Sequence, residues 1–225
     1  MPSFFRFPHT PHLTWLAAGQ PRDDKVLTPP EQADFLSSEI IIEEKADGAN
    51  LGISISPAGE LRLQNRGHYL EAPYSGQFSR LGSWLTAKED QLFDALAGGL
   101  ILYGEWCQAV HSMDYDALPD FFLGFDVYDR QSGRFWSTRR RDALLTQLGL
   151  HPIHRVACET TTLPALVERL TQSASHYRAG HPEGFYLRRE NPEWLEQRAK
   201  LVRPDFTQAI DEHWSRRGIV ANRLK

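Results

Sequence analysis

The sequence EIIIEEKADGANLGISIS, residues 39–56, sets the first expectation for the fold. Its opening EIIIEEK is dense in β-branched residues, ADGAN has the composition of a turn, and LGISIS alternates apolar with small polar residues. The alternation resumes in LRLQNRGHYL, residues 61–70, after a second turn at residues 57–59. We therefore predict three antiparallel strands in succession.

Later segments show strand and helix patterns without strict alternation. Apolar residues recur at helical spacing between Phe78 and Gly98, and residues 139–150, 162–175 and 207–218 also predict helices. Strands are predicted at residues 100–107, 121–129 and 183–190, followed by a short segment AKLVRPDF at residues 199–206. Strands interrupted by helices in this way predict an α+β fold with mainly antiparallel sheets flanked by helices.

Composition predicts one ordinary globular domain over residues 1–225, with 41% hydrophobic and 24% charged residues. We expect residues 1–37 to form an extended segment, because their prolines prevent a long helix. We expect residues 204–225 to form a helical tail. The formal charge of −4 excludes a surface coated with positive charge, but not a local basic groove. No leader or membrane-spanning pattern is found, and two separated cysteines, each expected to be buried, fit a reducing cytoplasm.

Lys45 lies among acids, in EEKADG, and a lysine in that setting is by itself more often a solvated ion pair than a catalyst. The later predicted strands carry further reactive side chains. GEW ends one strand with Glu105, FDVYD places Phe125 in another, and EGFYLRR begins with Glu183. AKLVR then adds Lys200 and Arg203. Acids, an aromatic ring and bases spread over several strands are expected where one pocket is built from a sheet.

This ordered set resembles the covalent nucleotidyltransferase superfamily, which contains RNA ligases, DNA ligases and mRNA capping enzymes. The position five residues after the lysine holds Asn50 in this chain, which resembles the RNA ligases with an EKxxGxN pattern. DNA ligases usually have arginine at that position. FPHTPHL, EKADGAN, AKLVRP and DEHW resemble a bacterial family of ATP-dependent RNA ligases over essentially the whole chain. The resemblance implies a nucleotidyltransferase adenylation domain, here expected without an appended oligonucleotide-binding domain.

The resemblance also implies a reaction. Lys45 would attack ATP to form lysyl-AMP, the AMP would pass to an RNA 5′-phosphate, and an RNA 3′-hydroxyl would then seal the strand. The implied cofactors are ATP and Mg²⁺ or Mn²⁺. The implied partners are RNA ends and an end-healing kinase or phosphatase, with no membrane.

Each matching position takes a role from the family. The resemblance implies that Glu44 presents its backbone to adenine, Gly48 allows close approach and Asn50 acts on the RNA end. It implies that Arg66 contacts phosphate, Glu105 contacts the ribose and Phe125 stacks on adenine. It also implies that Glu183 supports Mg²⁺ and that Lys200 closes the site, with Asp47, Arg198 and Arg203 as further candidates.

Several alternatives stay open at this point. A DNA ligase, a GTP-dependent capping-type enzyme or a catalytically silent nucleic-acid binder would share parts of the pattern. By strand alternation Glu43 shares the face of Lys45, where it would orient the amine or pair with it. RRRD at residues 139–142 is expected to be a solvated helix start, and the basic residues near the C-terminus would either line an RNA path or solubilise the chain. These basic residues are Arg216, Arg217, Arg223 and Lys225.

Overall fold

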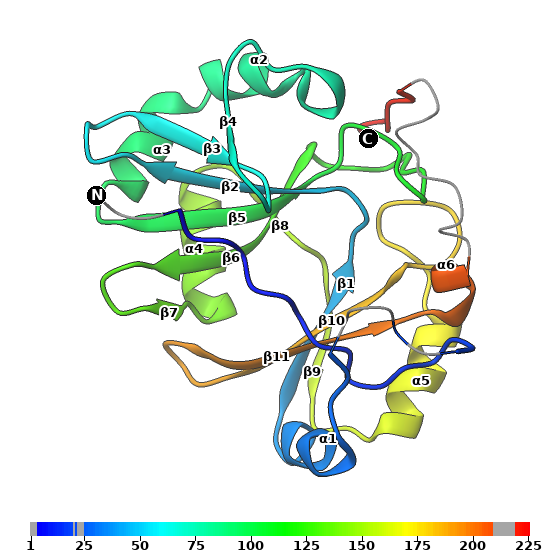
Figure 1. Cartoon of the computed structure of the whole chain (residues 1–225). Coiled ribbons are helices and arrows are strands. Elements are labelled where there is room, and N and C mark those ends of the chain that lie inside the picture. Colours follow the sequence, from blue (N-terminus) through cyan, green and yellow to red (C-terminus); the bar gives the residue numbers. More distant parts are fainter. Residues whose placement is uncertain (1–3, 20, 22–24, 209–218) are drawn as a thin grey trace.

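The computed structural model describes residues 4–19, 21, 25–208 and 219–225. Its strands form two sheets, seen one above the other in Figure 1. The smaller sheet has the order β11-β10-β1-β9, and contains β1 (Ile40–Lys45), β9 (Arg155–Glu159), β10 (Gly184–Glu190) and β11 (Leu195–Val202). The larger sheet has the order β4-β3-β2-β5-β6-β7, with β8 paired to β6.

The strands of the larger sheet are β2 (Ala49–Ile55), β3 (Leu61–Gln64), β4 (Tyr69–Leu70), β5 (Leu100–Trp106), β6 (Phe122–Asp129), β7 (Arg134–Phe135) and β8 (His151–Pro152). Neighbouring strands are antiparallel throughout both sheets except for β6 and β8. The predicted α+β fold with mainly antiparallel sheets is therefore correct.

The prediction of three successive antiparallel strands is wrong for the first pair. β1 lies between β10 and β9, so both of its edges are occupied, and β2 lies between β3 and β5 in the other sheet. Residues 46–48 are thus a crossing between the two sheets and not a hairpin turn. Lys45 is the last residue before that crossing.

Helices cover the outer faces of the sheets (Figure 1). They are α1 (Pro29–Phe35), α2 (Leu81–Thr86), α3 (Glu89–Leu96), α4 (Thr138–Gln147), α5 (Leu163–Gln172) and α6 (Pro204–Gln208), with a 3-10 turn η1 (Gly76–Phe78). α1 interrupts the expected extended segment because Thr28 and Glu31 form a capping box and proline occupies the first turn. Among the described residues, no helix has the length and apolar character needed to cross a membrane.

Both faces of the larger sheet are covered. Leu102 of β5 belongs to the main core, which also contains Leu92 and Leu96 of α3. Its neighbours Ile101 and Tyr103 point the other way, and pack with aromatic residues of the N-terminal segment. Alternation along one strand therefore places the N-terminal segment on the face opposite the helices.

Residues 219–225 lie along the loop that follows β5. Asn222 is buried there, donates to the carbonyls of Cys107 and Ala109, and accepts from the amide of Tyr115. The DEHW segment and Arg216 and Arg217 lie outside the described residues. Of the two cysteines expected to be buried, Cys107 is buried and Cys158 is exposed.

Candidate active site

Lys45 forms an ion pair with Glu183. Its Nζ lies 2.7 Å from the Glu183 Oε2, and the lysine side chain is 28% exposed while that of the acid is 5% exposed. The strand register explains the pairing, since Lys45 is opposite Gly184, the first residue of β10. Two sequence-predicted site residues that are far apart in the chain are thus in direct contact.

Acids around Lys45 control its charge. Burial lowers the pKa of the amine, but the carboxylates of Glu183, Glu105 and Asp47 outweigh burial, so its pKa is raised and the ammonium form is favoured. Burial raises the pKa of Glu105 to about 7, although Lys45 and Arg66 oppose this shift. Burial likewise raises the pKa of Glu183 to about 7, against the pull of Lys45.

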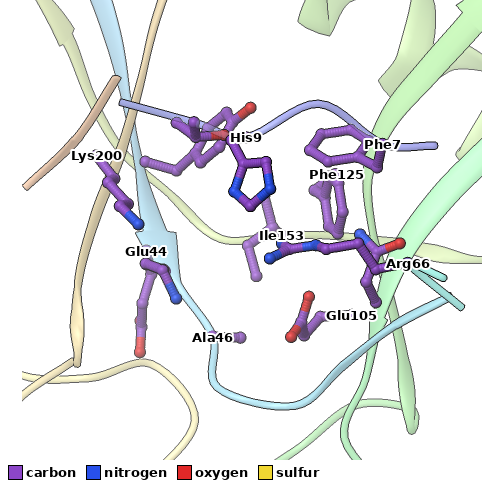
Figure 2. A pocket seen from close by; sticks show the side chains of 13 residues that line it. Phe7, His9, Glu44, Ala46, Arg66, Glu105, Phe125, Ile153 and Lys200 are labelled. Atoms are coloured by element: carbon purple, nitrogen blue, oxygen red, sulfur yellow. The ribbon is translucent and has the colours of Figure 1, made fainter. Parts of the chain in front are cut away.

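A pocket opens beside Lys45 between the two sheets (Figure 2). One part of its wall is aromatic, from Phe7, Phe125 and Tyr186, and basic side chains contribute another part. The full lining consists of Phe7, His9, Thr10, Glu44, Lys45, Ala46, Asn50, Arg66, Glu105, Phe125, Ile153, Tyr186 and Lys200. The structure therefore brings most of the sequence-predicted nucleotide contacts to one cavity.

Glu44 borders this pocket without pointing its carboxylate into it. Its Oε2 accepts from the amide of His176 at 2.8 Å and its Oε1 accepts from the Ser175 hydroxyl. Strand alternation had predicted this outward direction, which leaves the backbone of Glu44 against the pocket.

Gly48 lies in an open groove that adjoins the pocket and shares Lys45, Asn50, Arg66 and Glu105 with it. A Cβ at Gly48 would lie 2.7 Å from the carbonyl oxygen of Trp106, and the Gly48 amide donates to Glu105 Oε1 at 3.0 Å. The need for glycine thus comes from packing of the crossing against β5. The predicted close approach of a nucleotide to Gly48 remains a prediction, and Gly48 does line the adjoining groove.

Asn50 stands at the junction of the pocket and the groove. Its Oδ1 and Nδ2 are both buried, and neither has a hydrogen-bond partner among the residues that the structure describes. A buried amide without partners is costly unless something else satisfies it. Asn50 therefore has hydrogen-bonding capacity available for a ligand.

Asp47 is held by the loop after β5. Its Oδ2 accepts from the amides of Ser112 and Met113 at 2.7 and 3.2 Å, and its own amide donates to the Tyr115 hydroxyl at 2.7 Å. These contacts make Asp47 an anchor of the crossing.

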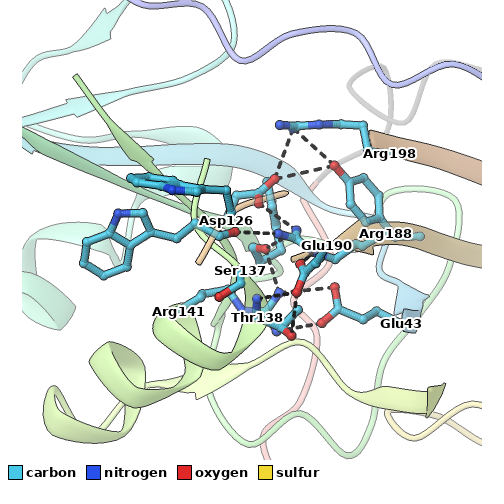
Figure 3. Close-up of polar contacts among 12 residues, drawn as sticks. Glu43, Asp126, Ser137, Thr138, Arg141, Arg188, Glu190 and Arg198 are labelled. Carbon is cyan, nitrogen blue, oxygen red and sulfur yellow. Dashed lines mark hydrogen bonds and ion pairs between the residues drawn. The ribbon is translucent and has the colours of Figure 1, made fainter. Parts of the chain in front are cut away.

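Glu43 contacts neither Lys45 nor the pocket, which corrects both roles considered for it. Its two carboxylate oxygens accept from Arg141 at 2.6 and 3.2 Å, and both side chains are fully buried (Figure 3). Arg141 also corrects the expectation of a solvated helix start at RRRD, since it points inward from α4 and donates to the carbonyl of Phe125.

The two arginines among the further candidates, Arg198 and Arg203, do not line the pocket. Arg198 donates to Asp126 and stacks on the Phe135 ring at 3.9 Å, so a buried acid and an aromatic face hold it away (Figure 3). Arg203 pairs with Asp205 at the surface. Lys200 is therefore the residue of the predicted closing segment that reaches the pocket.

Sequence reasoning missed six lining residues, namely Phe7, His9, Thr10, Ala46, Ile153 and Tyr186. Tyr186 carried a usable signal, because it alternates with Gly184 on the predicted strand and so shares the side of the sheet that carries Lys45. The N-terminal residues belong to FPHTPHL, which resembles the family, but no role was assigned to them, and an irregular segment has no periodicity from which to read direction.

A divalent cation would find only a partial ligand set here. Within the described part of the chain, no group of three or more histidine, cysteine, aspartate or glutamate side chains is placed to hold a metal. The carboxylates of Glu183 and Glu105 nevertheless both raise the pKa of the Lys45 amine. Mg²⁺ is commonly bound through one or two carboxylates together with substrate phosphates, and these two acids fit that mode.

Known structures share this fold. A mutant of Naegleria gruberi RNA ligase with ATP and Mn matches with a TM-score of 0.65 and 14% identity, covering 92% of this chain and 59% of that one. The same ligase with PPi matches with a TM-score of 0.60 and 14% identity, covering 92% and 64%. This chain thus spans about three fifths of the length of the ligases it matches.

A comparison with curated protein sequences found no match. The family description "RNA ligase", however, matches residues 38–202, which is most of the chain and includes every site residue except those of the N-terminal segment. The chain belongs to the RNA ligase family.

Proposed function

We propose that the protein is an ATP-dependent RNA ligase that works through a lysyl-AMP intermediate on Lys45. The observation that carries the proposal is the position of Lys45, at the crossing between two sheets, hydrogen-bonded to a buried acid and facing a pocket with aromatic and basic walls. The Naegleria ligases that share the fold were solved with ATP and Mn and with PPi, which supports the same nucleotide for this chain.

In the first step the Lys45 amine forms a bond to the α-phosphorus of ATP, and the bond from that phosphorus to pyrophosphate breaks. The amine has to be neutral to attack, whereas the acids around it favour its protonated form. Glu183 accepts the hydrogen bond of the amine at 2.7 Å, so it is placed to orient the nucleophile and to receive its proton.

The remaining pocket residues would hold the nucleotide. Phe125 and Tyr186 offer ring faces or edges for adenine, and Glu44 offers its backbone to the base. Arg66 and Lys200 supply positive charge for the phosphates. Glu105, which lines the pocket, would accept hydrogen bonds from the ribose hydroxyls.

Glu183, with Glu105, would also hold Mg²⁺ or Mn²⁺ together with the phosphates of ATP. Such a cation supplies neutralisation of the charge that develops on the transferring phosphate.

The groove beside Lys45 is the proposed place for the RNA end. It contains Arg66 and the unpartnered amide of Asn50. An RNA 5′-phosphate would take the AMP there, and a 3′-hydroxyl would displace it to close the strand. Ends of this kind are the products of end-healing kinases and phosphatases, which are therefore the expected partners, and a cytoplasmic location remains a prediction.

The test is covalent labelling. The wild-type protein, incubated with a divalent cation and α-labelled ATP, is expected to acquire label, and Lys45→Ala is expected to acquire none. No adduct with the wild type, or an adduct that survives Lys45→Ala, would rule out the mechanism. Parallel reactions with GTP, and with nicked RNA, single-stranded RNA and nicked DNA, separate an RNA ligase from a capping-type enzyme and a DNA ligase. Nucleic-acid binding without any adduct would instead indicate a catalytically silent binder.

A further inference from the structure

Residues 7–13, here called the strap, cross from the larger sheet to the smaller one (Figure 1). Three of them, Phe7, His9 and Thr10, line the pocket. At one end Phe7 is 2% exposed, and its ring meets those of Tyr103 and Phe125 edge-on at 4.9 and 5.3 Å. At this end the strap is therefore packed into the aromatic cluster of the larger sheet.

The other end of the strap is hydrogen-bonded to β11. The Lys200 amide donates to the carbonyl of Pro11 at 2.8 Å, and the Leu13 amide donates to the carbonyl of Lys200 at 2.7 Å. The strap thus extends the smaller sheet at the very residue that reaches the pocket. Both ends are fixed, so the residues between them have defined positions.

Between these anchors the side chains of His9 and Thr10 line the pocket. Thr10 lies beside the Tyr186 hydroxyl. The His9 ring lies in the middle of the view in Figure 2, with Lys200 on one side and Phe125 and Arg66 on the other. His9 is exposed to solvent, so neither packing nor burial accounts for its direction.

The chemistry around His9 indicates a ligand. An imidazole can donate hydrogen bonds to an anion, and it gains positive charge if it is protonated. The pocket already gathers the basic residues Lys45, Arg66 and Lys200 near His9. Several donors that converge on one cavity without an equal number of acids are suited to phosphate oxygens.

We propose that the strap is a wall of the nucleotide site, and that His9 binds a phosphate of the nucleotide. This inference rests on the proposed function, because the nucleotide is the substrate of Lys45. It adds a binding residue that lies outside residues 38–202, the part of the chain that the family description covers.

The test compares binding of two ligands to His9→Ala, His9→Gln and wild type. One ligand is α,β-methylene ATP, which carries phosphates but cannot transfer its AMP, and the other is adenosine, which carries none. His9→Ala is expected to weaken the ATP analogue about tenfold, the effect of one hydrogen bond to a charged group, and to leave adenosine unchanged. His9→Gln, which keeps a donor, is expected to lose less.

His151→Ala is the matched control, because His151 is also exposed but lies in β8 and not in the pocket lining. It should bind both ligands as the wild type does. Equal binding of the ATP analogue by His9→Ala and wild type would overturn the proposal. Equal weakening of both ligands would also overturn it, since His9 would then shape the wall without contacting phosphate.

Labelling of Lys45 separates this result from a failure of the proposed function. If the wild type forms no adduct with ATP, the ligase mechanism itself is wrong. If the wild type forms the adduct and His9→Ala reaches the same rate at every ATP concentration, only the role of His9 is wrong. The expected result is a higher ATP concentration for half-maximal rate, with a similar maximal rate.

Discussion

Glu43 and Lys45 lie two residues apart on β1, and each forms an ion pair, yet the two pairs are built differently. Glu43 is fully buried, and both of its oxygens accept from the equally buried Arg141. Lys45 makes a single contact to Glu183 and keeps 28% of its side chain exposed beside the pocket. One strand thus carries a bidentate pair that faces the interior and a single-contact pair that faces a cavity.

The difference separates stability from reactivity. A bidentate pair between a guanidinium and a carboxylate fixes geometry and leaves little capacity for other partners. In Figure 3 the Glu43–Arg141 pair belongs to a buried network that joins the two sheets, in which Arg188 of β10 also donates to Asp126 of β6. The Lys45–Glu183 pair can exchange its partner for a ligand, which a nucleophile requires.

The largest effect on stability is expected from breaking the buried pair. Glu43→Ala leaves the Arg141 charge buried without its main partner, which should cost about 3–5 kcal/mol of the free energy of unfolding. Urea denaturation measures this loss. The control is Glu193→Ala, which removes the exposed partner of Arg139 and should cost less than about 1 kcal/mol. A loss as small for Glu43→Ala would show that the two sheets do not depend on this pair.

The next effect is expected at the other pair, on rate and not on stability. Glu183→Gln keeps the shape of the side chain but removes the charge that orients the Lys45 amine and accepts its proton. We expect transfer of AMP to Lys45 to slow about 100-fold in a single turnover. The melting temperature should stay the same or rise, because burial disfavours the carboxylate. A fall in melting temperature comparable to that of Glu43→Ala would show that the Lys45–Glu183 pair also stabilises the fold.

A smaller effect is expected in the pH dependence of stability. Burial raises the pKa of Glu105 to about 7, so the folded protein binds this proton more tightly than the unfolded chain does. Stability should therefore fall as the pH rises from about 4.5 to about 7, by about 3 kcal/mol from this group. Glu105→Gln should remove that part of the fall, since glutamine can still accept from the Gly48 amide.

Melting temperatures of wild type and Glu105→Gln between pH 5 and pH 8 measure this difference. Glu60→Gln serves as the control, because Glu60 is exposed and its removal should leave the curve unchanged. Parallel curves for wild type and Glu105→Gln would mean that the acid stays ionised in the fold.

The sequence was informative where structure depends on neighbours in the chain. The patterns at residues 100–107, 121–129 and 183–190 were short-range, and the structure has β5, β6 and β10 there. The sequence was not informative where strands from distant segments pair. Nothing local shows that β1 pairs with β10 and β2 with β5, because the same alternation would also fit a pairing of β1 with β2.

The same limit applies to the site. Lys45, Glu105, Phe125 and Lys200 were found because their order along the chain resembles a known family, and the structure gathers them in one pocket. The partner of Glu43 was not found, since Arg141 is 98 residues away and sits in a run of arginines that reads as solvated. His9 was missed because no role was assigned to FPHTPHL and the strap has no periodic pattern from which to read side-chain direction.

The contacts of Asn222 have a consequence for mutations far from the pocket. Asn222 holds the Tyr115 amide and the Cys107 and Ala109 carbonyls, and the Tyr115 hydroxyl in turn accepts from the amide of Asp47, two residues after Lys45. A substitution at residue 222 would therefore loosen the loop that braces the reactive lysine, although residue 222 does not line the pocket.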